Sequence, residues 1–349
     1  MFVRFVDRED ELGALRDWCS RFRYTPLFIY GPEGCGKTRL LREFVKKFDE
    51  YFGEGSIAIY IDAMEDRDVD RAVLSSLGVC KVVSIARICL ETISDLLSAS
   101  VPIGQALSRS ISRIVDKVAE RLGKKNLEDS YVLVVIDDVV RAIGLDKVEW
   151  YVKYLFETMN KLYEEYRPRA INFIATTSEG VSRRLVAKHR HAEIVLMWNL
   201  DRDSFEELFH ELKPPDDVKF EDVWQLLGGN PGKLIELADR YSWNIDKMLR
   251  YYETRIREVV KKIAREGLID ELRHFVEDIV SAEKVLDRKM SILEDMLEEE
   301  NLILYKHWVL LTSRYEIFDK AQPDIGIGRY YAWQVPMYRE LVKKALASI

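Results

Sequence analysis

The fold of this chain is decided by the stretch Leu27-Phe-Ile-Tyr30-Gly31-Pro-Glu-Gly-Cys-Gly-Lys37-Thr38. Its first four residues form an apolar run that predicts a buried strand, and an amphipathic helix is expected over Arg39–Phe52. Between them, residues 31–38 fit the pattern Gly-x-x-x-x-Gly-Lys-Ser/Thr. This pattern, placed between a strand and a helix, is typical of a phosphate-binding loop. The sequence therefore predicts a P-loop, the phosphate-binding element of many ATP-binding proteins.

The composition of this loop follows from phosphate chemistry. Gly31, Gly34 and Gly36 allow a tight turn in which several N–H groups converge on one phosphate, and the helix N-terminus adds its positive end. Lys37 supplies a charge to the β- and γ-phosphates, and the Thr38 hydroxyl is a ligand for Mg²⁺. We expect ATP or ADP with Mg²⁺ to be bound by these residues and by Pro32, Glu33, Cys35 and Arg39. The alternative is a glycine-rich turn whose lysine is merely exposed.

Two carboxylates follow a second apolar run. Tyr131–Asp137 predicts a buried strand, so Asp137 and Asp138 would lie at its carboxyl end, where ligands bind in open α/β sheets. We expect Asp137 to hold Mg²⁺ through its water shell and Asp138 to orient or deprotonate the attacking water. Asp138 is one methylene shorter than the glutamate usual in vigorous ATPases, so we expect slow hydrolysis. The alternative is a strand that ends in solvated aspartates.

Weaker candidates follow the run Ala170–Thr176. Hydroxyl residues continue from its end to Ser178 and could contact the γ-phosphate or the lytic water, with an ordinary polar turn as the alternative. Further on, Arg190 is the best candidate for an arginine finger, in its own chain or a neighbour's, ahead of Arg183 and Arg184. Each of these arginines is also explained by a surface or interdomain charge.

Strands alternate with helices over the first 200 residues. The apolar runs are nearly continuous, as expected for parallel strands covered on both faces, and the alternation predicts a doubly wound α/β domain. The expected strands are Pro26–Tyr30, Ser56–Asp62, Tyr131–Asp137, Ala170–Thr176 and Glu193–Met197. The expected helices are Arg39–Phe52, Ile85–Ala99, Gly104–Leu122 and Lys147–Tyr166. Residues 1–200 are therefore predicted to form the P-loop core.

The pattern then changes. Four helical stretches separated by proline and glycine turns predict an all-helical lid over residues 201–264. In residues 265–349, further helices precede apolar stretches at Leu302–Tyr305 and Trp308–Thr312, which predict a hairpin with Tyr330–Val335 as a third strand. Helices followed by a small sheet indicate a winged-helix domain.

Composition narrows the class of protein. The chain has 349 residues and a formal net charge of -7, which argues against a protein that coats nucleic acid regardless of sequence. Its four cysteines form no CxxC pair, which predicts a reduced compartment without a disulfide framework or cysteine metal site. No apolar run approaches the roughly 20 residues that cross a bilayer. We therefore expect a cytoplasmic protein without a membrane partner. The glutamate run Glu298–Glu300 is expected to lie on a solvated helix face.

Two further segments complete a resemblance to a known family. Residues 5–12, Phe-Val-Asp-Arg-Glu-Asp-Glu-Leu, are similar to its F-x-x-R-E-x-E-L opening, and residues 228–232, Gly-Gly-Asn-Pro-Gly, match its lid turn. With the loop and the aspartate pair in this order, the chain resembles the archaeal ATPase family in the STAND and AAA+ neighbourhood of P-loop NTPases. The resemblance implies an ATPase core, a helical lid and a winged helix. It also implies nucleotide-contacting roles for Val6 and Arg8 in the opening and for Pro231 in the lid, and sensor roles for Ser178 and Arg190.

Three hypotheses follow for function. The first is an ATPase that works as a molecular switch, with a lid and winged helix that respond to nucleotide and act on a protein or DNA partner, in a monomer or an oligomer. The second is an ATP-regulated DNA-binding protein comparable with replication initiators, because residues 301–349 carry seven Lys/Arg and four Asp/Glu, a net charge of +3. The third is a small-molecule kinase, which the long helical extension argues against.

Overall fold

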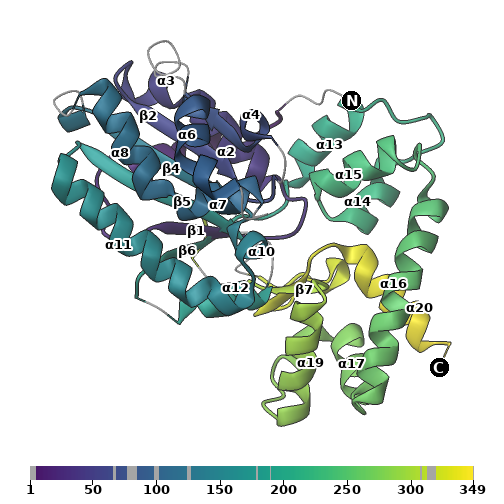
Figure 1. Cartoon of the computed structure of the whole chain (residues 1–349). Helices are drawn as coiled ribbons and strands as arrows, with labels where there is room; N and C mark the ends of the chain where they lie inside the picture. Colours follow the sequence, from purple (N-terminus) through teal and green to yellow (C-terminus); the bar gives the residue numbers. More distant parts are fainter. Residues whose placement is uncertain are drawn as a thin grey trace.

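A six-stranded sheet with helices on both faces forms the first half of the computed structural model (Figure 1). The structure describes residues 5–65, 68–76, 85–97, 102–123, 127–177, 180–188, 190–306, 309–312 and 320–348. The strands of the sheet are β1 (Leu27–Tyr30), β2 (Ile57–Asp62), β3 (Val73–Ser75), β4 (Tyr131–Asp137), β5 (Ala170–Thr177) and β6 (Glu193–Leu196). Five of these strands were predicted, each to within one residue at either end. The short strand β3 was missed.

The strand order brings the predicted site residues to one edge of the sheet. The order is β3-β2-β4-β5-β1-β6, and all neighbours are parallel except β2 and β3. Strand β5 therefore lies between β1, which leads into the P-loop, and β4, which ends in Asp137. Since the carboxyl ends of parallel strands meet at the same edge, the P-loop and the aspartates are brought together by topology.

Alternating residues of the strands face two separate hydrophobic clusters. In β4, Val132, Val134 and Ile136 belong to one cluster and Leu133 and Val135 to the other. The second face is covered by α1 (Glu9–Cys19), α2 (Lys37–Lys46) and α3 (Phe48–Phe52). The first is covered by α6 (Ile85–Leu97), α7 (Ile103–Arg109), α8 (Ile111–Leu122) and α11 (Val148–Tyr166). Shorter elements are α4 (Val69–Ala72), α10 (Val139–Ile143), η1 (Leu145–Lys147) and α12 (Gly180–Ala187). This two-sided burial explains why the strands are apolar throughout, and the fold is the expected mixed α/β fold with a mostly parallel sheet.

Helices make up most of the second half. They are α13 (Arg202–Glu211), α14 (Phe220–Leu227), α15 (Pro231–Asp239), α16 (Ile245–Arg265), α17 (Ile269–Glu277), α18 (Ile279–Ala282), α19 (Arg288–Glu299) and α20 (Pro336–Leu346). Their buried residues, from Phe205 to Leu346, form one hydrophobic cluster that runs across the predicted boundary at residues 264 and 265. The division into core, lid and C-terminal domain therefore stays a prediction. None of the helices in the described residues is long and apolar enough to cross a membrane.

The predicted hairpin near the C-terminus was wrong. Strand β7 (Ile303–Tyr305) pairs in antiparallel fashion with β8 (Tyr331–Trp333), which lies in the stretch expected to be a third strand. Residues 309–311 instead extend the main sheet beside β6, where Leu196 N–H donates to Val309 O and Leu311 N–H donates to Leu196 O. The edge of a parallel sheet offers free backbone groups, and these outweighed the local pairing that a short turn would have favoured.

The expected solvated glutamate run was also wrong in part. Glu298 on α19 is only 1% exposed, because it faces Arg183 and Arg184 on α12. Arg184 also pairs with Asp295. Both arginines are therefore paired with α19, in line with the charge contact that was the alternative to a finger role. These pairs join the sheet domain to the C-terminal helices.

Candidate functional site

The side chain of Lys37 is hydrogen-bonded to the backbone of the P-loop itself. Gly36 precedes α2 with a φ of 104°, a left-handed conformation that side-chain-bearing residues rarely adopt. The Lys37 side chain is buried and its Nζ donates to the carbonyl oxygens of Gly31, at 2.9 Å, and Pro32, at 3.1 Å. The positive charge therefore lies inside the curve of the loop, at the N-terminus of α2, where an anion is favoured.

Asp137 is buried behind the loop with both oxygens occupied. Its Oδ2 accepts a hydrogen bond from Tyr60 on β2, at 2.7 Å, and its Oδ1 accepts one from Thr176 on β5. The Thr176 hydroxyl in turn accepts the Asp138 N–H at 2.8 Å. Each carboxylate oxygen keeps a further lone pair, so these contacts fix the orientation of the carboxylate and still leave it able to accept another hydrogen bond or bind a cation.

Asp138 differs sharply from its neighbour. It is half-buried and adopts a left-handed φ of 51° at the start of α10. Burial and the charge of Asp137 raise the pKa of Asp138 to about 6, and the nearby charge of Lys37 opposes this rise. Two adjacent carboxylates in different environments are a common arrangement where one binds and the other exchanges protons.

A cavity of about 320 Å³ opens in front of these groups. Polar and charged residues of the loop line it, together with apolar residues of the opening and the lid. The lining residues are Phe5, Val6, Arg8, Glu33, Gly34, Cys35, Gly36, Lys37, Thr38, Arg39, Asp138, Arg141, Leu200, Leu208, Pro231, Gly232 and Ile235. Most predicted nucleotide-binding residues thus lie on one cavity, whereas Gly31, Pro32 and Asp137 lie behind its surface.

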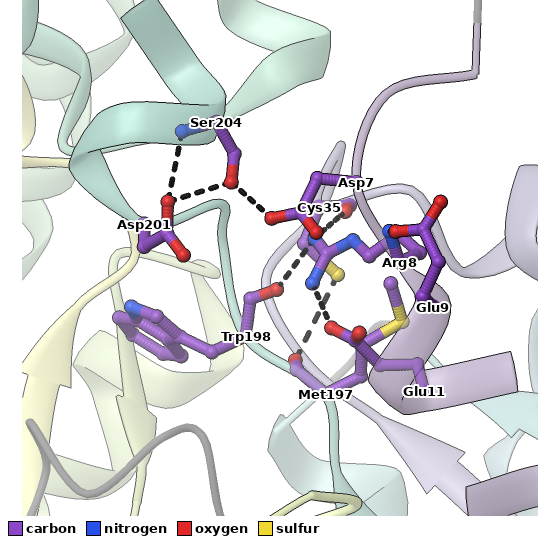
Figure 2. Close-up of polar contacts among 9 residues, drawn as sticks. All are labelled: Asp7, Arg8, Glu9, Glu11, Cys35, Met197, Trp198, Asp201 and Ser204. Atoms are coloured by element: carbon purple, nitrogen blue, oxygen red, sulfur yellow. Dashed lines mark hydrogen bonds and ion pairs between the residues drawn. The ribbon is translucent and has the colours of Figure 1, made fainter. Parts of the chain in front are cut away.

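Arg8 lines the cavity and is also bonded to the loop (Figure 2). Its guanidinium pairs with Glu11 and donates to the carbonyl oxygens of Cys35, at 2.9 Å, and Trp198, at 3.0 Å. Asp7 beside it accepts a hydrogen bond from Ser204, on the first helix of the lid. The opening segment is therefore bonded to the P-loop, to the end of β6 and to the lid at once.

The lid turn lies directly on the P-loop. Asn230 caps α15 by accepting the Lys233 N–H, and its Nδ2 donates to Glu33 O at 2.9 Å. Gly232 N–H donates to Gly34 O at 2.9 Å, and a Cβ on Gly232 would lie 2.8 Å from Gly34 Cα. This close approach explains the glycine after Pro231.

The remaining predicted residues are placed differently. Arg190 precedes β6, and Glu193 at the start of β6 pairs with Leu27 at the start of β1, so Arg190 lies at the edge of the sheet opposite the P-loop. The structure therefore does not bring it to the loop of its own chain, because four residues of β6 separate the two edges. Ser178 lies outside the described residues. Arg141 on α10, which was not predicted, lines the cavity instead.

Other functional candidates were missed because they are distant in sequence. Tyr60 lies within the apolar strand β2, so nothing in the sequence pattern marks it as the partner of Asp137. Gln334, just after β8, accepts the Glu33 N–H at 3.0 Å and has no motif around it. Asn199 follows β6 at the carboxyl edge of the sheet, and this position is the signal that could have identified it.

Curated relatives and solved structures resemble much of the chain. An uncharacterized ATP-binding protein of Methanocaldococcus jannaschii is 22% identical over 344 residues, which covers 88% of this chain and 90% of the relative. A second, from Pyrococcus abyssi, is 25% identical and covers 68% of this chain and 70% of the relative. The replication initiator DnaA bound to AMPPCP and single-stranded DNA is 17% identical, with a TM-score of 0.38 over 83% of this chain and 77% of its own. The Aeropyrum pernix ORC2 protein is 13% identical, with a TM-score of 0.40 over 99% of this chain and 97% of its own.

The family model gives the most direct assignment. The model described as the ATPase domain predominantly from Archaea matches residues 5–237. The matched region runs from the opening through the loop and the aspartates to the lid turn, which are the segments that surround the cavity. The chain therefore belongs to this family of ATPase domains, found predominantly in Archaea.

Proposed function

We propose that this protein is an ATP-binding molecular switch that hydrolyses ATP slowly and changes the docking of its lid and C-terminal segment. The observation that carries the proposal is the cavity in front of Lys37, because its walls come from the P-loop, the opening and the lid. A ligand in this cavity would touch all three. Nucleotide state can therefore alter how they pack, and this is the requirement for a two-state switch.

The two ends of the cavity suit the two ends of a nucleotide. The base would lie among Val6, Leu208 and Pro231, which offer apolar surface. The phosphates would lie at the N-terminus of α2, where Lys37 adds a positive charge. Such a mixture of apolar walls and a few convergent polar groups is typical of ligand sites.

The residues beside the phosphate end also suit Mg²⁺. The Thr38 hydroxyl lines the cavity and Asp137 lies behind it, and hard oxygen donors of this kind are the ligands that Mg²⁺ prefers. When bound, the ion would neutralise charge on the phosphates. Tyr60 and Thr176 would hold the Asp137 carboxylate in one orientation toward it.

Hydrolysis would depend on Asp138. With a pKa of about 6 it is mostly ionised at neutral pH, so it can accept a proton from an attacking water. Arg141 lines the same cavity and would place a positive charge near the terminal phosphate within its own chain. The short Asp138 side chain supports slow turnover.

Substitution of Lys37 tests the proposal. We expect Lys37→Ala to weaken ATP and ADP binding on the order of 100-fold, because a desolvated charge contact to phosphate is lost. Lys46→Ala is the matched control, since Lys46 lies exposed in the last turn of the same helix and pairs with Glu43. Calorimetric titration measures both affinities. Equal ATP affinity in wild type and Lys37→Ala would refute the proposal.

The DNA-binding alternative rests on the net charge of +3 in residues 301–349. Burial weakens this basis, because Lys306 is 4% exposed and Arg339 donates to the Val276 and Pro323 carbonyls in the interior. Lys344 pairs with Glu253 on α16. A salt-titrated binding assay with duplex DNA distinguishes the two functions. Affinity at about 50 mM salt that falls steeply as salt rises would favour the DNA role.

A further inference from the structure

The tip of the P-loop is bonded on both sides by residues from distant parts of the chain. The Glu33 N–H donates to Gln334 Oε1 at 3.0 Å, and the Glu33 carbonyl accepts from Asn230 Nδ2 at 2.9 Å. Gln334 lies between β8 and α20, and Asn230 lies in the lid turn. The two peptide groups on either side of the Glu33 Cα are thus held, one by the C-terminal segment and the other by the lid.

A third amide closes these contacts into a network. Asn199 Oδ1 accepts from Asn230 Nδ2 at 2.9 Å, and Asn199 Nδ2 donates to the Gln334 main-chain oxygen at 3.1 Å. We call Asn199, Asn230, Gln334 and the Glu33 backbone the amide ladder. Its three side chains are 3%, 0% and 3% exposed, so their hydrogen bonds are shielded from water. Buried polar networks of this kind fix one arrangement of the groups they join.

We propose that Gln334 is a positioning residue that couples nucleotide binding at the P-loop to docking of the C-terminal segment, residues 320–346. The inference rests on the proposed function and names the contact through which that switch operates. Both contacts of the ladder with the loop use the backbone N–H and C=O of Glu33, and Glu33 lines the cavity together with Gly34 to Thr38. A nucleotide in the cavity would therefore contact the residue that the ladder holds, and each would stabilise the other.

One group of the ladder favours separation of the C-terminal segment from the P-loop. Within the described residues, Gln334 Nε2 is buried without a hydrogen-bond partner. A buried unpaired donor destabilises the state that contains it, and water would satisfy this donor once the C-terminal segment moved away. The hydrogen bond to Gln334 Oε1 thus stabilises the docked state, and the unpaired Nε2 of the same amide destabilises it. Such a balance suits a contact that a ligand can bias.

Coupling must be reciprocal, which gives the test two readouts. If docking strengthens nucleotide binding, nucleotide must strengthen docking by the same factor. In the wild-type chain we expect saturating ADP, and a non-hydrolysable ATP analogue, to slow hydrogen exchange in α20. The expected slowing is about 3- to 10-fold, the worth of one buried hydrogen bond.

The substitution Gln334→Met keeps the length of the side chain and removes its hydrogen bonding. We expect this full-length variant to bind both nucleotides about 3- to 10-fold more weakly. We also expect it to lose the nucleotide-dependent slowing in α20 while keeping the slowing in α2. A purely structural role would lower thermal stability with and without nucleotide alike and leave that difference in α20 unchanged.

Gln225→Met is the matched control, because Gln225 lies exposed on α14 and should leave both readouts as in wild type. Nucleotide affinity of Gln334→Met within about twofold of wild type, with the α20 response retained, would overturn the coupling alone. Failure of the wild-type chain to bind nucleotide would overturn the proposed function and this inference together. The two failures are therefore distinguishable.

Discussion

Two sets of contacts fix the P-loop, and they differ in how far along the chain they reach. The local set links Lys37 to Gly31 and Pro32, five or six positions away. The distant set links Glu33 to Asn230 and Gln334, which are 197 and 301 positions away. Under the proposed function, the local set would form the phosphate site. The distant set would then determine which other parts of the molecule respond when that site is filled.

The same division holds for the packing around the loop. The sheet and its covering helices bury their residues in two clusters that lie almost wholly within the first 200 residues. The C-terminal half meets that body through Arg183 and Arg184 on α12, through the backbone of Leu196, and through the amide ladder. The molecule thus has two hydrophobic bodies, joined by polar contacts and by Leu304, Ile327 and Ala332, which belong to a cluster of the sheet. Each connection can be broken separately.

The largest expected effect comes from the ion pairs between the two bodies. In Glu298→Gln the guanidinium of Arg183 stays buried without its carboxylate partner. Removing one member of a buried pair typically costs about 3–5 kcal/mol. We expect the free energy of unfolding, measured with urea, to fall by this amount. Glu299→Gln, on the exposed face of the same helix, should change it by less than about 0.5 kcal/mol. Equal effects of the two variants would mean that these pairs do not join the bodies.

A smaller effect is expected where the lid touches the loop. In Gly232→Ala the new Cβ would lie 2.8 Å from Gly34 Cα and 2.9 Å from Gly34 O, so the lid turn must move away. Overpacking of this kind costs about 1–3 kcal/mol, and we expect it as weaker nucleotide binding by calorimetry. Gly13→Ala is the control, because nothing lies within 4 Å of its new Cβ on helix α1. That control should stabilise the fold by about 0.5–1 kcal/mol and leave binding unchanged. Undiminished binding in Gly232→Ala would show that the lid contact does not shape the site.

The smallest effect concerns pH. Burial, followed by the charge of Glu283, raises the pKa of Glu294 on α19 from 4.5 to about 7. The folded state thus binds this proton more tightly than the unfolded state. Its stabilising contribution is complete below pH 4.5 and is lost as pH rises through 7. Thermal unfolding should therefore show that Glu294→Gln gains stability relative to wild type between pH 5 and pH 8. A constant difference between the two chains across that range would contradict the shift.

The sequence predicted the local set of contacts and not the distant one, for physical reasons. The strands around Leu27 and Leu133 are long apolar runs, and the loop motif lies between a strand and a helix, so both are encoded within a few residues. Strand β7 has three residues and carries no periodic signal, so its pairing with β8 was missed. Glu298 was assigned to solvent because a run of glutamates is usually solvated. Its burial depends on an arginine more than a hundred positions away.

The ladder also sets an order of events during synthesis. Gln334 follows Glu33 by 301 positions, and at about 5–20 residues per second a ribosome needs roughly 15–60 s to reach it. Throughout that interval the nascent loop has its lysine and its helix but lacks its C-terminal amide. A nucleotide that meets the growing chain would therefore encounter the local half of the site first. The amide ladder is completed only once Gln334 has emerged.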